Sequence, residues 1–237
     1  MALLNTLEKA RKDPNSMKGK ILDVARKIFG EYGFHGTTTR MIAQEVGIDI
    51  STLYYHWGEK ADLFEAVILD IYEDLRVKLI EVEEVIHGRP LAERMDIAID
   101  MVTDYLFQSP EICNLILFRY FTRTRHASNL DFRVPEFISD IAYSMGLSRG
   151  KTDLPLATRT RVLGMMNLIY NFVAGQNFFE GLLRTESEEY RRTVKETLKF
   201  LLIPAFTQAE TGFHNPNGVG DAASVREGAA REAKKEE

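Results

Sequence analysis

One stretch of the chain decides the fold that the sequence predicts: TTRMIAQEVGIDISTLYYHW, from Thr38 to Trp57. It contains two short helical segments with a glycine between them. Three apolar residues of the first segment are spaced to share one helical face: Ile42, Ala43 and Val46. Thr38 offers an N-cap hydroxyl to this segment, and Gly47 follows where a helix commonly ends in a left-handed residue. The stretch therefore predicts a helix, a tight turn and a second helix.

The second segment covers residues 50–57 and has the composition of a helix that can bind DNA. Asp49 precedes it in an N-cap position. Leu53 and Trp57 are spaced at i and i+4, so they form an inward face. The remaining polar residues carry hydroxyl or aromatic hydrogen-bonding groups: Ser51, Thr52, Tyr54, Tyr55 and His56. A helix-turn-helix motif needs such a second helix, whose exposed N-terminal residues reach base edges in the major groove.

The motif and its surroundings resemble the DNA-binding domain of the TetR (tetracycline repressor) family. The resemblance covers about Lys18 to Leu75. It includes FGEYGF at 29–34, TTR at 38–40, VGI at 46–48, TLYYH at 52–56 and Lys60. Order, spacing and residue types agree over the whole domain, which is more specific than a bare helix-turn-helix pattern. Two residues depart from the family pattern: Ile50, where a polar or small residue is usual, and Trp57, where phenylalanine or valine is usual.

This resemblance implies which residues contact DNA. A helix N-terminus with free N–H groups suits phosphate, and only Arg40 has the chemistry for a bidentate contact to guanine. The expected contact residues are Thr38, Thr39, Arg40, Ile50, Ser51, Thr52, Tyr54, Tyr55, His56 and Lys60. The simpler interpretation of the first three is a pair of helix caps and a solvated arginine. One of the two tyrosines could also pack inward.

The composition describes a helical protein with a sizeable core. The chain has 237 residues, of which 45% are hydrophobic and 27% are charged, and it contains no long apolar run. We therefore expect a soluble protein, and no secretion signal is visible at the N-terminus. Cys113 is the only cysteine, which excludes an intrachain disulfide and a cysteine-based zinc site. This cysteine usage fits a cytoplasmic location.

The net charge of the chain does not indicate a nucleic-acid-binding protein. The chain carries −5 in total, with +1 on residues 1–15, 0 on residues 16–62 and −6 on the rest. Attraction to phosphates must then come from the local placement of a few cations. Composition alone favours another function, and the motif outweighs it.

The sequence predicts an all-α fold in two domains. We expect a flexible N-terminal arm at 1–15 and a three-helix helix-turn-helix domain at 16–75. A helical ligand-binding and dimerisation domain follows at 76–210, and a disordered tail at 211–237. About nine helices are expected, at 16–32, 38–46, 50–57, 60–86, 91–108, 111–124, 135–146, 156–183 and 187–209. The arm carries Lys9, Arg11 and Lys12, so it could also touch phosphates.

The last two predicted helices are long and apolar. Such helices could fill the core of a monomer or form the interface of a helical dimer. The family resemblance favours the dimer, with both subunits contributing to a four-helix bundle.

The helical body also offers residues for a ligand pocket, because pockets are mostly apolar with a few placed polar groups. The candidates are Met101, Tyr105, Cys113, Leu117, Phe118, Phe121, Met165, Met166, Asn167, Ile169, Tyr170, Asn171, Phe172 and Gln176. Most could equally be ordinary core residues. The amides stand out because buried amides need partners, which a dimer could also provide. A cluster of arginines could bind an anionic ligand, although a solvated face is the simpler interpretation: Arg119, Arg123 and Arg125.

No catalytic signature is visible in the sequence. It has no glycine-rich phosphate loop and no His-Glu-x-x-His motif, and its five histidines do not cluster. We therefore expect a protein that is not an enzyme and that has neither a cofactor nor a metal site. The leading hypothesis is a homodimeric repressor that binds an inverted-repeat operator in double-stranded DNA and is released by a small apolar ligand. The alternatives are a DNA-binding regulator without a ligand, and a helical interaction protein whose head has lost DNA binding.

Overall fold

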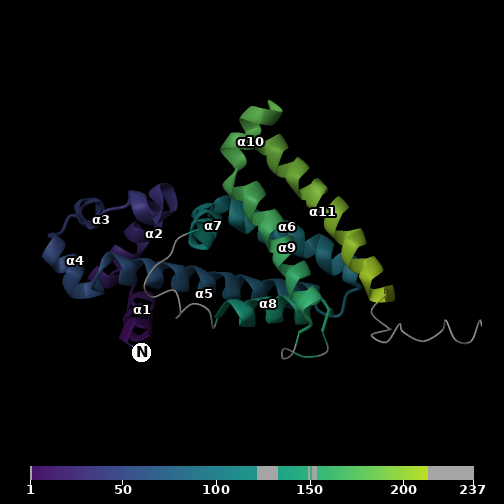
Figure 1. Ribbon diagram of the computed structural model, residues 1–237, viewed down its shortest axis with the longest axis horizontal. Coiled ribbons are helices and arrows are strands. Elements are labelled where there is room, and N and C mark those ends of the chain that lie inside the picture. The colour runs from purple at the N-terminus through teal and green to yellow at the C-terminus, as the bar shows by residue number, and fades with distance from the viewer. Residues whose placement is uncertain (1, 122–132, 149, 151–153, 213–237) are drawn as a thin grey trace, which may run out of the picture.

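The computed structural model describes residues 2–121, 133–148, 150 and 154–212. In these ranges the chain forms eleven helices and no strand, which confirms the all-α prediction. The helices are α1 (Ala2–Lys12), α2 (Met17–Gly36), α3 (Thr39–Val46), α4 (Ile50–Trp57), α5 (Lys60–Ile86), α6 (Leu91–Gln108), α7 (Glu111–Phe121), α8 (Arg133–Ser144), α9 (Leu156–Ala174), α10 (Gln176–Leu183) and α11 (Ser187–Gly212). Figure 1 shows a small head of α1–α4 at one end of the molecule and a larger helical body at the other.

The head is built around α2, α3 and α4, and its turns follow the local chemistry. Ser16 caps α2 by accepting a hydrogen bond from the N–H of Gly19. Gly47 ends α3 in the left-handed conformation, with φ 78° and ψ 38°. Phe29 and Leu53 are fully buried, so the inward faces of α2 and α4 form one small core.

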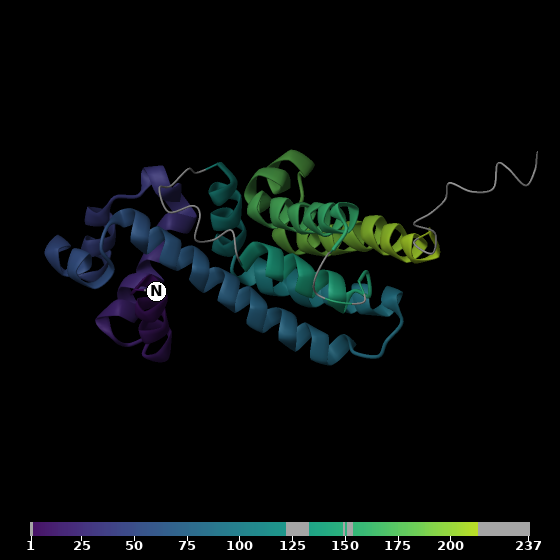
Figure 2. The same cartoon turned by 60° about the horizontal axis from the view of Figure 1, so that its bottom comes forward.

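The long helix α5 joins the head to the body (Figures 1 and 2). Its start is fixed by a capping box in which Glu59 and Asp62 exchange side-chain and backbone hydrogen bonds. Residues 63–71 of α5 are all buried, because the helix runs between the head on one side and α6, α7 and α8 on the other. The helix is therefore held along its length by elements of both parts.

The N-terminal segment differs from the sequence-based expectation. The flexible arm expected at 1–15 is wrong for most of this range, because residues 2–12 form helix α1. Leu7 and Ala10 are buried against the head, and Arg11 forms ion pairs with Asp70 and Asp74 of α5. Because the partners of Arg11 lie about sixty residues away along the chain, the local sequence pattern did not reveal this helix.

The end of the chain also differs, because the helix expected at 156–183 is divided into α9 and α10. Gly175 separates the two helices, and an added Cβ there would lie 2.4 Å from the Phe179 ring. The ring of Phe179 thus packs over a glycine that ends α9. Together with α1, this break raises the helix count from about nine to eleven. Most of the tail expected at 211–237 lies outside the described residues.

The body is closed by α9, α10 and α11, which form an inverted V with α10 at its apex (Figure 1). Tyr190 of α11 is buried and donates a hydrogen bond to the Phe172 carbonyl of α9 at 2.8 Å. Lower down, α11 packs against α6 and α9 packs against α7 and α8. Within the described residues, no helix is both long and apolar enough to cross a membrane.

Candidate DNA-binding surface and ligand cavity

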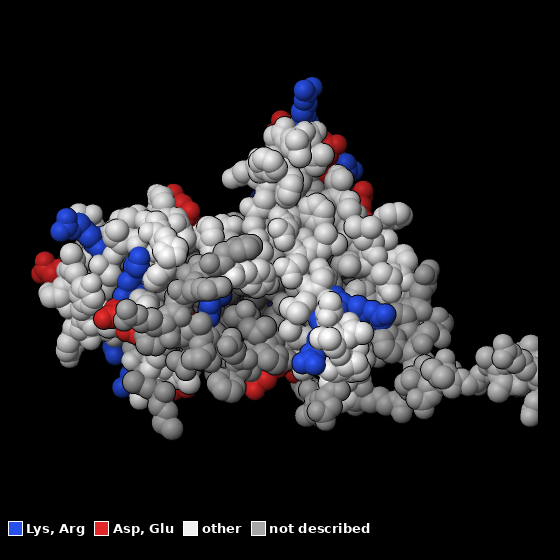
Figure 3. Space-filling model, in the orientation of Figure 1, with Lys and Arg blue, Asp and Glu red and all other residues white. Residues whose placement is uncertain are grey.

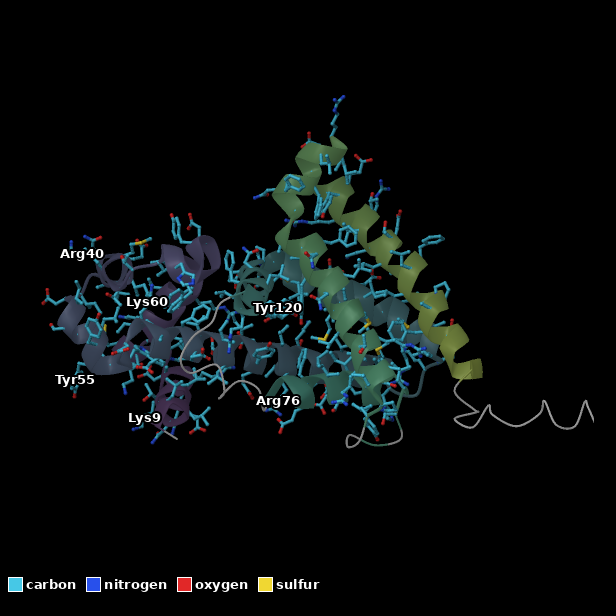
Figure 4. All side chains as sticks on the ribbon, viewed as in Figure 1. Lys9, Arg40, Tyr55, Lys60, Arg76 and Tyr120 are labelled. Atoms are coloured by element: carbon cyan, nitrogen blue, oxygen red, sulfur yellow. The ribbon has the colours of Figure 1, made fainter. Side chains whose placement is uncertain are left out.

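The outer edge of the head presents polar side chains from α3 and α4. Figure 4 shows Arg40 and Tyr55 on this edge, away from the body. Tyr55 is 85% exposed and Tyr54 is 46% exposed, and Ser51 and Arg40 are exposed as well. In the part of the chain that the structure describes, no hydrogen bond or ion pair engages the Arg40 guanidinium. These four side chains, which we call the head edge (Arg40, Ser51, Tyr54 and Tyr55), are free to contact a partner.

The opposite side of α4 anchors this edge to the head. Leu53 and Trp57 are buried, and the Trp57 indole N–H donates to the Lys18 carbonyl of α2 at 3.2 Å. Ile50 is half-buried and packs against the head core, and Thr52 is half-buried too. The departure of Ile50 from the family pattern is therefore compatible with a packing role.

The start of α3 is capped as the sequence predicts. The Thr38 hydroxyl accepts a hydrogen bond from the Met41 N–H at 3.2 Å, and Thr39 is half-buried next to it. Thr37 has another role, since its buried hydroxyl donates to the Gly33 carbonyl at 2.8 Å and closes α2. Asp49 occupies the N-cap position of α4 as predicted, but its side chain makes no capping hydrogen bond.

Lys60, which was expected to contact DNA, makes its hydrogen bonds within the head. Its ammonium group donates to the carbonyls of Phe34 and Thr37, both at 2.9 Å, and lies 4.4 Å from the centre of the Phe34 ring. Burial lowers the pKa of this lysine. Figure 4 places Lys60 among the helices of the head, whereas Arg40 and Tyr55 lie on its edge. Lys60 therefore holds the chain between α2 and α3 in place.

His56 is half-buried beside the start of α2. Its Nδ1 atom is buried and has no hydrogen-bond partner in the described ranges. Burial, together with the charge of Lys18, lowers the pKa of His56 from 6.5. The imidazole is thus neutral at neutral pH and offers a hydrogen bond, but no positive charge, to a phosphate.

A second candidate site is a cavity of about 310 Å³ in the body, lined by residues of α5, α6, α8 and α9. This volume is at the lower end of the usual range for small-molecule pockets. Five of the residues proposed from the sequence line it: Tyr105, Met165, Met166, Ile169 and Tyr170. Tyr170 is buried, and this burial raises the pKa of its hydroxyl.

The other pocket candidates do not line this cavity. The residues that do not line the cavity are Met101, Cys113, Leu117, Phe118, Asn167, Asn171, Phe172 and Gln176. Phe118 packs over Gly33, and the amides of Asn167 and Asn171 donate to carbonyls one turn earlier in α9. Their polar groups are thus used within the protein. The side chain of Phe121 and the residues Arg123 and Arg125 lie outside the described part.

Most residues of the walls that α5, α6 and α8 contribute were not predicted from the sequence. These include Leu75, Leu79, Val82, Met95, Ile99, Val102, Leu106, Phe137, Ile141 and Met145. Helical periodicity marks the residues from α5 and α6 as inward faces. Periodicity cannot distinguish a face that meets other side chains from one that borders an empty space.

The head and body meet through a charged cluster and a close helix contact. Arg26 of α2 pairs with Asp70 and Asp74 of α5, and its Nε atom lies 3.3 Å from a Glu111 carboxylate oxygen of α7. Burial alone would lower the pKa of Arg26, but these carboxylates raise it. Next to this cluster, the Asn114 amide of α7 donates to the Gly30 carbonyl of α2 at 3.2 Å. Helix α2, which packs against the motif helices α3 and α4, is therefore connected to the body through both α5 and α7.

Comparison with known proteins identifies the head. Residues 21–67 match the family model described as bacterial regulatory proteins, tetR family. An HTH-type transcriptional regulator of Staphylococcus aureus strain USA300 is 40% identical over 65 residues, which cover 26% of this chain and 35% of that protein. The chain thus spans about a third of the length of the curated relatives it matches.

Solved structures extend the likeness to the whole fold. A transcriptional regulator from Rhodococcus sp. RHA1 superposes with a TM-score of 0.59 at 14% identity, covering 79% of this chain and 96% of that one. A TetR transcriptional regulator from Legionella pneumophila gives 0.57 at 16% identity, covering 77% and 97%. AibR, solved with isovaleryl coenzyme A and operator DNA, gives 0.55 at 14% identity, covering 78% and 96%. At these identities the matches show a shared fold.

Proposed function

Because this chain carries the helix-turn-helix domain of the TetR family on a fold shared with TetR regulators, we propose that it is a sequence-specific DNA-binding transcriptional regulator. In this proposal the protein is a homodimeric repressor that a small ligand releases from its operator. The observation that carries the proposal is the head edge. It combines an uncommitted guanidinium with three exposed hydroxyl-bearing side chains on a helix of major-groove size.

A dimer is supported by apolar side chains exposed on the last three helices. We call this surface the α9–α11 face, defined by Leu156, Phe178, Leu182, Leu183, Phe200 and Leu201. Phe200 is 77% exposed and Phe178 is 70% exposed. In Figure 3 the side of α9–α11 turned to the viewer is mostly uncharged, with charges gathered toward its two ends. An exposed apolar surface with a charged margin is typical of a protein interface.

In a twofold dimer, each of the two copies of α4 would bind one half-site of the DNA. Recognition helices of such dimers enter successive major grooves about 34–36 Å apart. The operator is then an inverted repeat, because the twofold axis of the protein coincides with that of the site. Residues 16–62, which contain the motif, are neutral overall, so attraction to phosphates depends on the placement of a few cations.

The position of the cavity supports the proposal that a ligand controls the distance between the two recognition helices. Its walls include α5, whose N-terminal half belongs to the head core, and α6, which α5 contacts in the body. A ligand that favours one position of α5 would change the distance between the two heads. It shifts the equilibrium only by its differential affinity for the DNA-binding and released forms. One protein of this fold, AibR, has been solved with both an acyl-coenzyme A ligand and DNA.

The test is selection of binding sites from random duplex DNA with the full chain, followed by sequencing, at two salt concentrations. Enrichment of an inverted repeat is the expected result, and it would also supply the operator. Binding that is weak, strongly salt-dependent and indifferent to sequence would contradict the proposal and favour a helical interaction protein.

A further inference from the structure

The cavity wall contains one arginine whose charge is not paired with any carboxylate that the structure describes. Arg94 of α6 lines the cavity and is half-buried, and its Nε atom is buried without a hydrogen-bond partner. Within the described residues no carboxylate pairs with its guanidinium. A guanidinium stays charged in proteins, and a charge that is partly buried without a partner is costly. This cost would be recovered if an anion bound there.

The other charged residues of the wall already have partners. Arg76 pairs with Glu73 at 2.7 Å, and Lys78 pairs with Glu81 at 2.9 Å. Glu83 accepts a hydrogen bond from the Ser144 hydroxyl. Asp140 is also engaged. Arg94 is thus the cation of the wall that has no carboxylate partner among the described residues.

The rest of the wall is suited to the apolar part of a ligand and can adapt to its shape. Four methionines line it, and methionine fills irregular spaces and accommodates different shapes: Met95, Met145, Met165 and Met166. Met95 is the chain neighbour of Arg94, so the charge and the apolar lining are adjacent on α6. A cavity of about 310 Å³ has room for a short apolar chain.

From these features we propose that the ligand is a small monocarboxylate with an unbranched apolar chain, whose carboxylate is bound by Arg94. Guanidinium and carboxylate groups form paired, charge-assisted hydrogen bonds, which are stronger than neutral ones. The chain of the ligand lies among the methionines and Ile99. This inference rests on the proposed function in one respect, because it takes the cavity as the site of the controlling ligand.

The experiment compares hexanoate, octanoate and decanoate with the corresponding neutral amides by calorimetry on the full chain. The acids and amides have nearly the same shape, so the difference reports the charge. We expect at least one acid to bind about tenfold more tightly than its amide. Equal binding of acid and amide, or no measurable binding of any of these acids, would overturn the inference.

The variant Arg94→Met should remove the preference for the acid while retaining binding of the amide. Arg94→Lys keeps the positive charge and should restore part of the preference, which separates a lost charge from a damaged fold. Arg89→Met is the matched control, because Arg89 is an exposed arginine near the start of the same helix and lies 3.7 Å from Glu93. A preference for the acid that persists in Arg94→Met, or that disappears in Arg89→Met, would contradict the assignment.

DNA binding measured in the same samples separates this inference from the proposed function. Acid binding through Arg94 without release of the selected operator would leave the carboxylate site intact and reject ligand-gated repression. Release of the operator by the acid in the original protein, but not in Arg94→Met, is the outcome expected if both are correct.

Discussion

At the scale of single residues, Lys60 is a cation whose hydrogen bonds lie inside the head. Its two hydrogen bonds hold the carbonyls of Phe34 and Thr37, which lead into the cap of α3 at Thr38. A phosphate contact needs a cation that projects toward the duplex, whereas this ammonium group is turned into the head. Its effect on DNA binding should therefore pass through the position of α3.

This role predicts a specific pattern for Lys60→Met. We expect a loss of about 1–2 kcal/mol in the free energy of unfolding, because two carbonyls lose a charged donor. The slope of log affinity for DNA against log salt concentration should stay unchanged, whereas loss of a phosphate contact would reduce it by about 0.9. Urea unfolding and salt titration measure the two quantities. Lys27→Met is the control, since Lys27 only pairs with Asp23 on the surface of α2.

Arg40 is expected to behave in the opposite way. Its exposed side chain makes no hydrogen bond or ion pair within the described residues, so Arg40→Ala should change the unfolding temperature little. If it binds a base edge, specific DNA affinity should fall by about 1–3 kcal/mol. A binding titration with the selected operator measures this change. Arg89→Ala, which removes an exposed arginine of the body, should leave DNA affinity unchanged. Equal effects of the two variants would argue against base contact by Arg40.

The single cysteine tests whether the core is packed as described. Cys113 is fully buried, and burial raises the pKa of its thiol well above the usual range. The thiolate, which is the reactive form, is therefore scarce in the folded protein. We expect slow reaction with a thiol reagent in buffer and fast reaction in denaturant, followed by absorbance. Fast labelling of the folded protein would show that α7 is not packed in this way.

At the scale of helices, the motif depends on a kink in α2. Gly33 has φ 68° and ψ 177°, a conformation that is essentially restricted to glycine, and it turns the chain toward Thr37 and α3. A β-carbon at Gly33 would be in ordinary van der Waals contact with the Phe118 ring at 3.6 Å. The cost of a side chain at Gly33 therefore comes from the backbone conformation and not from a steric clash. Gly47 has a milder left-handed conformation and open space around it.

These two glycines therefore make a matched pair of variants. Gly33→Ala should lower the free energy of unfolding by about 1–3 kcal/mol. Gly47→Ala should lower it by about 1–2 kcal/mol, because the left-handed helical region is less restricted than the region of Gly33. Urea unfolding of both variants gives the comparison. A smaller loss for Gly33→Ala than for Gly47→Ala would contradict the kink.

The helix α1 changes how the head is attached to the body. Arg11 of α1 and Arg26 of α2 share the same two carboxylates, Asp70 and Asp74 of α5. Burial and the neighbouring charge of Asp74 raise the pKa of Asp70, even though both arginines act against that shift. The first helix is thus bound to the same point of α5 as the motif domain, and a movement of α5 would carry both.

At the scale of the whole molecule, the proposed dimer sets the positions of the two heads relative to each other. The α9–α11 face lies on the body, away from the head edge (Figure 1). A dimer formed through this face leaves both copies of α4 accessible. The spacing between the heads then depends on the body, where the cavity lies.

Phe200→Glu tests this assembly. A charge at a central aromatic position of an interface typically costs about 2 kcal/mol or more, so the dimer dissociation constant should rise about 30-fold. Sedimentation velocity at several concentrations measures it. Val77→Glu, which places the same charge on an exposed valine of α5, is the control. A dimer of unchanged stability in Phe200→Glu would exclude the α9–α11 face as the interface.

The sequence by itself determined the helix-turn-helix motif and the all-helical class. Caps, turns and inward faces such as those of Thr38, Gly47, Leu53 and Trp57 depend on residues within a few positions of one another, and periodicity records them directly. The order of α1 and the role of Lys60 depend on contacts with residues far along the chain, Asp70 for Arg11 and Phe34 for Lys60.

Only the tertiary structure decided where the cavity lies and which cation of its wall is left unpaired in the described part of the chain. The cavity is a space left between α5, α6, α8 and α9, and no local pattern encodes a space between distant helices. Arg94 has the same chemistry in the sequence as Arg89. It differs because folding brings its guanidinium to an apolar wall without a carboxylate partner among the described residues, whereas Arg89 stays exposed beside Glu93.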